Sequence, residues 1–152
     1  MLLAWVRVLS IASVALYLVP TGAHLFELTG KLALSPAAYM ATQSVYDGWA
    51  LFGIVVLAAL LLTALHAILR RSERRVFILS LLAFVCLLGT QAVFWVFTFP
   101  MNVASRNWTV MPEPFEAARR QWEYSHAASA MLTFVALIAI AAAVATDERG
   151  RT

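Results

Sequence analysis

The hydrophobic positions of this chain gather into four long runs separated by polar stretches. The runs cover about residues 2–23, 49–69, 76–99 and 125–145. An α-helix needs roughly 20 apolar residues to cross the hydrocarbon of a bilayer. The runs do not alternate polar with apolar positions as a half-buried strand does. The pattern therefore predicts an all-α fold, an integral membrane four-helix bundle that forms a single domain over residues 1–152.

The composition supports this fold class. Of the 152 residues, 62% are hydrophobic and 12% are charged, whereas a typical soluble domain is about 25% charged. The formal net charge is +3, but the cations lie at the ends of the apolar runs, where they set membrane orientation. We therefore expect the lipid bilayer as a partner, and no nucleic acid. Cys86 lies inside an apolar run and is expected to be a small packing residue.

The arginines and lysines divide unequally between the two sides that four spans create. One side holds Arg7, Arg70, Arg71, Arg74, Arg75, Arg149 and Arg151, and the other holds Lys31, Arg106, Arg119 and Arg120. Because the side richer in these cations faces the cytoplasm, we expect both termini to be cytoplasmic (N-in/C-in). The four-cation side is then the outer face.

The two outer connections are long, which is typical of loops with function or with structure of their own. They span residues 24–48 and 100–124. Ser35-Pro36 predicts a helix start, after which Tyr39, Gln43 and Tyr46 share one helix face. In the second connection, helix is expected from about Phe115 into the fourth span. The sequence therefore predicts that both outer connections are long, partly helical loops.

Polar side chains collect at the outer ends of the predicted spans. His24 and Glu27 are three residues apart, as are Glu123 and His126, so each pair shares a helix face. Two helices that each present an imidazole and a carboxylate can close around a metal ion. This spacing predicts a metal site with His24, Glu27, Glu123 and His126 as ligands of one transition-metal ion.

Other interpretations of the same residues stay open. Glu27 with Lys31, and Arg119 with Glu123, have the spacing of i,i+4 ion pairs, which favours a structural polar network. Metal-free acid–base use is a further interpretation. His66, at the inner end of the second span, is expected to be an interfacial residue. The tryptophans fall mostly near span ends, as an aromatic belt does.

The stretch from Phe99 to Ala130 carries a spaced set of polar residues. It contains Pro100-x-Asn102 at the end of the third run and Trp122-x-x-x-His126 at the entry to the fourth. With the four spans, this pattern resembles the anthrone oxygenase-like family of small membrane proteins, which are widespread in bacteria. Some fungal members are linked to the oxygenation of anthrones to anthraquinones. The resemblance implies a bacterial inner (plasma) membrane location and site roles for Asn102, Trp122 and His126.

The first functional hypothesis is a membrane-embedded oxidoreductase or oxygenase-like protein. Its substrate is an apolar aromatic or quinone-like molecule, bound at the polar outer site. His126 acts as the base, because an imidazole exchanges a proton near neutral pH. Glu123 and Asn102 complete the catalytic set. The residues expected to bind the substrate are Trp122, Tyr46, Gln43 and Arg119.

The alternative hypothesis is a non-enzymatic membrane protein. It would bind a metal, haem or lipid, or act as a small accessory subunit of a complex. The polar residues would then hold the outer ends of the helices together. A homo-oligomer is compatible with both hypotheses, but a pore is disfavoured because no span shows a sustained polar stripe.

Overall fold

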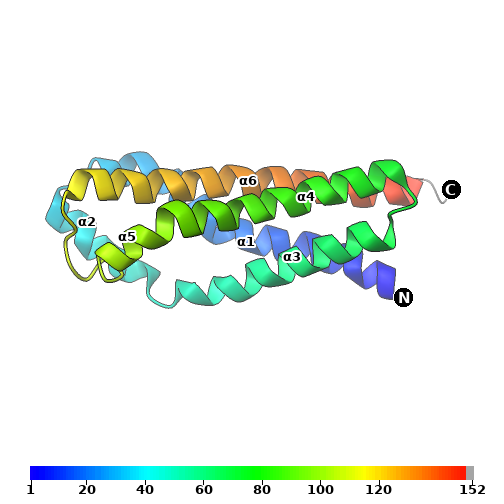
Figure 1. The fold of residues 1–152 in the computed structure, drawn as a ribbon, viewed down its shortest axis with the longest axis horizontal. Helices are drawn as coiled ribbons and strands as arrows, with labels where there is room; N and C mark the ends of the chain where they lie inside the picture. The colour runs from blue at the N-terminus through cyan, green and yellow to red at the C-terminus, as the bar shows by residue number, and fades with distance from the viewer. Residues whose placement is uncertain (150–152) are drawn as a thin grey trace.

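The structure, a computed structural model, describes residues 1–149, so that Arg151 of the predicted inner cations lies outside the described residues. Four long helices lie side by side along one axis (Figure 1). They are α1 (Leu2–Leu32), α3 (Phe52–Leu69), α4 (Arg74–Val93) and α6 (Phe115–Arg149). No strand occurs between residues 1 and 149. The predicted all-α fold with four apolar helices is confirmed.

The shorter elements lie together at one end of the bundle. They are α2 (Pro36–Thr42), the 3₁₀ turns η1 (Gln43–Tyr46) and η2 (Trp49–Leu51), the π-helical turn η3 (Phe94–Thr98) and α5 (Phe99–Ala104). This end is called the loop end. The opposite end, called the terminal end, carries both chain termini and the turn between α3 and α4 (Figure 1).

Four helical stretches are long and apolar enough to cross a membrane. They are Leu2–Leu32, Trp49–Leu69, Arg74–Ala104 and Phe115–Asp147. Large apolar side chains cover the outside of the bundle; Phe26, Leu61 and Ile54 are 87%, 71% and 68% exposed. Extended exposed apolar surface marks contact with lipid or with another protein. Together with the length of the helices, it indicates an integral membrane protein.

Two helices extend beyond the hydrophobic runs. α1 continues to Leu32, past the predicted end near residue 23, and α6 begins at Phe115, as predicted from the sequence. Both extensions carry charged residues, including Lys31 and Glu123, that are buried between helices. The loop end is therefore built partly from polar helix, and this is where the predicted site residues meet.

The middle of the bundle is an apolar core. Its fully buried residues include Val14, Ala59, Ala83, Leu87, Ala136, Ile140 and Ala143, from all four long helices. Small residues at helix interfaces let the backbones approach closely, which stabilises bundles in lipid. Cys86 packs against this core, as predicted. The core separates the polar groups of one end from those of the other.

Local sequence explains how the first connection folds. Ser35 Oγ accepts a hydrogen bond from the Ala38 N–H at 3.4 Å, and Pro36 is the first residue of α2, as the Ser-Pro pair predicts. Gly48 has a φ of +82°, in the left-handed region that glycine adopts without a steric penalty. The chain turns there from η1 into η2 and α3.

The π-helical turn η3 changes the course of α4 just before α5. A π turn inserts extra backbone into a helix and rotates the side chains that follow it. Gln121 Nε2 of α6 donates to the Phe97 carbonyl at 3.0 Å, and Thr98 Oγ1 lies 2.7 Å from Ser125 Oγ. These contacts fix η3 against α6 and place Asn102 beside that helix.

Candidate functional site

At the loop end, aromatic and imidazole rings from three elements converge. The ring centroids of His24 in α1 and His126 in α6 are 4.1 Å apart, with 24° between the planes. Trp122, one helical turn before His126, has its ring centroid 4.3 Å from that of His126. Tyr46 of η1 lies 4.5 Å from His24 between centroids. The two histidines that the sequence places far apart are therefore stacked on each other.

Several polar atoms in this cluster have no hydrogen-bond partner among the described residues. They are Nδ1 of His24, Nε2 of His126 and both side-chain amide atoms of Gln43, all buried. A buried polar atom left unpaired costs about 1–3 kcal/mol, so most are paired with protein or water. These atoms are therefore unsatisfied polar groups within the packed cluster.

These residues line a cavity of about 760 Å³, within the size range of small-molecule sites. Its wall is largely aromatic and aliphatic, with contributions from α1, η1, η2, α3, α4, η3, α5 and α6. The wall includes His24, Gln43, Tyr46, Trp49, Phe94, Trp122 and His126. An apolar cavity with a few convergent polar groups is the usual form of a small-molecule site.

Beside the cavity, the fully buried Glu123 is held by two partners. Lys31 Nζ lies 2.6 Å from Glu123 Oε1, and Tyr39 OH donates to the same oxygen at 2.9 Å. Lys31 Nζ also lies 4.6 Å from the ring centroids of Tyr46 and Trp122, which adds cation–π attraction. This group ties α1, α2 and α6 together.

The i,i+4 ion pairs expected from spacing are replaced by other contacts. Lys31 pairs with Glu123 on another helix, not with Glu27. Arg119 pairs with Glu116 at 2.6 Å, not with Glu123. Glu27 is exposed and accepts a hydrogen bond from Tyr46 OH. The buried carboxylate and the buried ammonium pair because neither has water to solvate it.

The predicted four-ligand metal site finds no support in this arrangement. The two imidazoles meet, but Tyr46 and Lys31 engage the carboxylates of Glu27 and Glu123. Within residues 1–149, no group of three or more His, Cys, Asp or Glu side chains is placed to hold a metal ion. A transition-metal site usually takes at least three protein ligands. The described geometry offers an imidazole pair instead.

The other predicted site residues differ in position. Asn102 lines the cavity, and its Oδ1 accepts from Trp122 Nε1 at 2.7 Å, which fixes the indole ring. Arg119 does not line the cavity, so its predicted substrate contact is not supported. Its guanidinium donates to the Leu34 carbonyl at 2.8 Å and lies over the ring of Tyr39. Arg119 thus secures the first connection to α6.

Sequence patterns did not predict two residues of this cluster, Lys31 and Trp49. Lys31 was expected only as an ion-pair partner of Glu27, and the sequence carries no local signal of its burial against Glu123. Trp49 was assigned to the aromatic belt, but its ring lies 4.9 Å from Tyr46 and 5.6 Å from His24 between centroids. Trp49 follows Tyr46 by three residues across the turn at Gly48, and this spacing was the sequence feature that could have indicated contact between the two rings.

Both tyrosines of the first connection retain their protons more strongly than usual. Burial, and then the charge of Glu123, raises the pKa of Tyr39 above its ordinary value of 10.0. Burial, and then the hydrogen bond to Glu27, raises the pKa of Tyr46 in the same direction. Both hydroxyl groups are therefore neutral donors at neutral pH.

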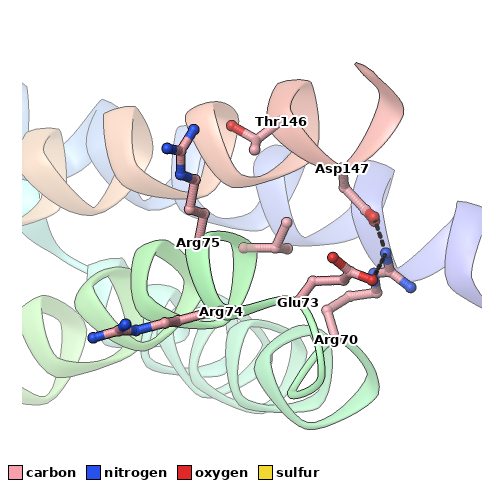
Figure 2. A pocket seen from close by; sticks show the side chains of 7 residues that line it. Arg70, Glu73, Arg74, Arg75, Thr146 and Asp147 are labelled. Carbon is pink, nitrogen blue, oxygen red and sulfur yellow. Dashed lines mark ion pairs between the residues drawn. The ribbon is translucent and has the colours of Figure 1, made fainter. Parts of the chain in front are cut away.

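The terminal end holds a second buried polar cluster that the sequence analysis did not predict. The buried carboxylate of Asp147 pairs with Arg7, whose Nε donates at 3.0 Å, and with Arg70 (Figure 2). Nearby, His66 of α3 is fully buried, with Nδ1 at 2.7 Å from Ser80 Oγ of α4. The packed helices cover the His66 ring, and its expected position at the membrane interface stays a prediction.

Comparison with known proteins identifies no relative of this chain. No protein-family model matches it, and no curated protein or solved structure matches it. The resemblance to the anthrone oxygenase-like family therefore rests on the spaced residues from Phe99 to Ala130 and on the four apolar helices.

Proposed function

We propose that this protein is a membrane-embedded oxygenase-like enzyme that acts on an apolar, oxygen-bearing aromatic or quinone-like molecule. One observation carries the proposal. A stacked pair of imidazoles, His24 and His126, lies in the wall of an aromatic-lined cavity and keeps buried ring nitrogens unpartnered. This arrangement combines a proton acceptor with a surface for a flat ring.

The walls of the cavity define the class of substrate. Trp49, Trp122 and Tyr46 offer ring faces and edges, which favour stacking with a planar aromatic molecule. Gln43 offers a carboxamide that can donate to a carbonyl or phenolic oxygen and accept from a phenol. No carboxylate or ammonium group in the described wall other than exposed Asp47 is available for a charged ligand. A neutral polycycle with one or two oxygens fits these groups.

The imidazole pair supplies the base. An unprotonated imidazole nitrogen can accept a proton, and two rings with centroids 4.1 Å apart repel each other if both are charged. The pair therefore takes up one proton at a time. For an anthrone-like substrate, His126 removes a proton from the methylene activated by the ring system. Positioned bases of this kind accelerate reactions by about 10²–10⁴-fold.

The proposed oxygenation consumes one dioxygen molecule for each substrate. Both C–H bonds of the activated methylene break, and one oxygen atom becomes the new carbonyl oxygen. The other oxygen atom leaves as water with the two hydrogens, so four electrons pass from carbon to oxygen. The imidazole pair accepts the first proton and returns it to the departing water. Asn102 positions Trp122, against which the ring system stacks.

The lipid side of the cavity supports entry from the membrane. Ile54, Leu57 and Trp95 line the cavity and are 68%, 58% and 59% exposed on the outside of the bundle. An apolar molecule dissolved in the bilayer therefore reaches the cavity between α3 and η3. From the uneven division of arginines we place both termini in the cytoplasm and the loop end at the outer face. A bacterial inner membrane follows from the family resemblance.

The first experiment measures oxygen uptake and quinone formation from an anthrone by the purified protein in detergent. The rate of substrate oxidation without protein is subtracted. We expect His126→Ala to lower kcat/KM by about 10²–10⁴-fold while the helical content stays unchanged. His66→Ala is the matched control, because His66 lies at the terminal end. The folded fraction of the His66→Ala variant should keep the full rate of anthrone oxidation.

Other outcomes separate the competing hypotheses. Full activity of His126→Ala would remove the base from the proposal. Tight binding of the anthrone without turnover would make the protein a carrier of such molecules and not an enzyme. Elemental analysis of the purified protein tests the metal prediction. Stoichiometric metal that disappears in His24→Ala would show that the imidazole pair is a ligand set.

A further inference from the structure

A second cavity lies at the terminal end, remote from the imidazole pair. It has a volume of about 300 Å³ and forms where the α3–α4 turn meets the end of α6. Its polar lining residues are Arg70, Glu73, Arg74, Arg75, Thr146 and Asp147 (Figure 2). Three arginines in one small cavity indicate affinity for an anion.

The charges around this cavity leave two arginines free. Arg7 and Arg70 neutralise the buried Asp147, and Arg70 also lies 4.0 Å from Glu73. Arg74 and Arg75 are exposed and form no ion pair with any carboxylate of the described residues. Because the two carboxylates among the described lining residues, those of Glu73 and Asp147, face Arg70, the field over Arg74 and Arg75 is positive.

The two free arginines project on different sides of α4. Figure 2 shows Arg75 rising from α4 toward α6 near Thr146, and Arg74 extending along α4 away from Asp147. Both lie in the first turn of the helix, and Glu73 at the N-cap makes no side-chain cap bond. Unpaired N–H groups and the helix dipole at this position favour an anion.

The surface of α4 next to Arg74 is apolar. Ile78, Leu82 and Val85 follow Arg74 at i+4, i+8 and i+11, so they share its helix face. They are 50%, 44% and 52% exposed. A cationic group at the end of an apolar stripe matches a molecule with an anionic head and long hydrocarbon chains. A free phosphate ion would use only the arginines.

We propose that the terminal-end cavity and the adjoining face of α4 bind an anionic phospholipid. Arg74 holds the phosphodiester, Arg75 adds positive charge on the side of α4 that faces α6, and the acyl chains lie along Ile78, Leu82 and Val85. A zwitterionic phospholipid brings a cationic headgroup that the arginines repel, so it binds more weakly. This site does not depend on the activity proposed for the loop end.

The test uses the full chain, purified in detergent and stripped of lipid. Native mass spectrometry measures binding of phosphatidylglycerol and of phosphatidylcholine, and thermal unfolding is followed with each lipid and with inorganic phosphate. We expect phosphatidylglycerol to bind at least about tenfold more tightly and to raise the Tm most. The Arg74→Gln/Arg75→Gln variant should lose this preference. Ile78→Ser should weaken lipid binding without altering the net charge.

Arg71→Gln is the matched control, because Arg71 is exposed in the same turn but does not line the cavity. It should keep the preference for phosphatidylglycerol. An equal loss in Arg71→Gln would overturn the site in favour of diffuse attraction between arginines and anionic lipid. Equal stabilisation by inorganic phosphate, or equal binding of both lipids by the natural chain, would also overturn it.

Discussion

At the loop end, two imidazoles and a carboxamide lie beside a cavity with polar atoms unpartnered, whereas at the terminal end Asp147 is buried between two arginines. A buried charge with partners holds helices together, since exposing either partner alone is costly. Buried neutral groups that face a cavity keep their capacity for a ligand. The same bundle thus separates a stabilising cluster from a cluster suited to binding.

The two ends of the bundle also differ in the residues that surround each cavity. At the loop end, the buried ion pair of Lys31 and Glu123 stands beside the cavity and is enclosed by aromatic rings. At the terminal end, the cations outnumber the carboxylates and reach the surface. We infer that aromatic burial prepares one end for an apolar molecule and that surplus arginine prepares the other for an anionic lipid.

The largest expected effect on stability comes from Asp147. Asp147→Ala leaves Arg7 and Arg70 facing each other without a carboxylate, and should lower the free energy of unfolding by about 3–5 kcal/mol. Binding of an anthrone-type ligand by the folded protein should not change. Denaturant unfolding in detergent and fluorescence titration of the ligand measure the two quantities.

Glu73→Gln is the control for that substitution. The Glu73 side chain is 59% exposed, and its Oε1 atom lies as far as 4.0 Å from Arg70 Nη2. Glu73→Gln should change stability by less than about 0.5 kcal/mol. If Asp147→Ala abolished ligand binding by protein that is still folded, the two ends would be coupled and the division between them would fail.

A smaller effect is expected from Tyr39→Phe at the loop end. The substitution keeps the ring but removes the hydrogen bond to the Glu123 carboxylate. A hydrogen bond to a charged group contributes about 1.5–3 kcal/mol, and we expect a loss of that size. Tyr124→Phe is the matched control, because Tyr124 is 56% exposed and should show almost no change. Equal stability of the two variants would contradict the anchoring role of Tyr39.

The smallest expected effect is a dependence on alkaline pH. The pKa values of Tyr39 and Tyr46 are raised in the folded chain, so above about pH 10 the unfolded chain releases protons that the folded chain keeps. The stabilisation is complete below that pH and is lost as the pH rises toward the folded values. The unfolding midpoint should therefore decrease as the pH is raised from about 9 to about 11.

The Tyr39→Phe/Tyr46→Phe variant sharpens this pH prediction, since it removes both tyrosine hydroxyl groups. Its unfolding midpoint should fall less steeply with pH than that of the natural chain. An unchanged slope would show that groups other than these two tyrosines cause the alkaline transition.

Much of the fold was predictable because its signals are local. An apolar run of about 20 residues forms a helix in lipid, where each backbone group must be paired within the segment. Ser35-Pro36 and the start near Phe115 were predicted for similar reasons, since caps and prolines act over one helical turn. The convergence of His24 with His126 was a hypothesis from spacing, and the structure brings these rings together.

The partners of the charged residues were not predictable from spacing. Glu27 and Lys31 have the separation of an ion pair, yet Lys31 turns to Glu123 on α6. His66 lies near arginines in sequence but is covered by packed helices. In both cases the energy of removing a group from water decides its partner, and that energy depends on neighbouring helices.

By itself, the sequence determined the helices, their apolar faces and the residue types at each end, because hydrophobic periodicity and capping act within one segment. Only the tertiary structure decided which imidazoles stack, which carboxylate is buried with Lys31 and where cavities remain. These depend on the packing of helices that are distant in sequence, since a side chain is desolvated only when another helix covers it.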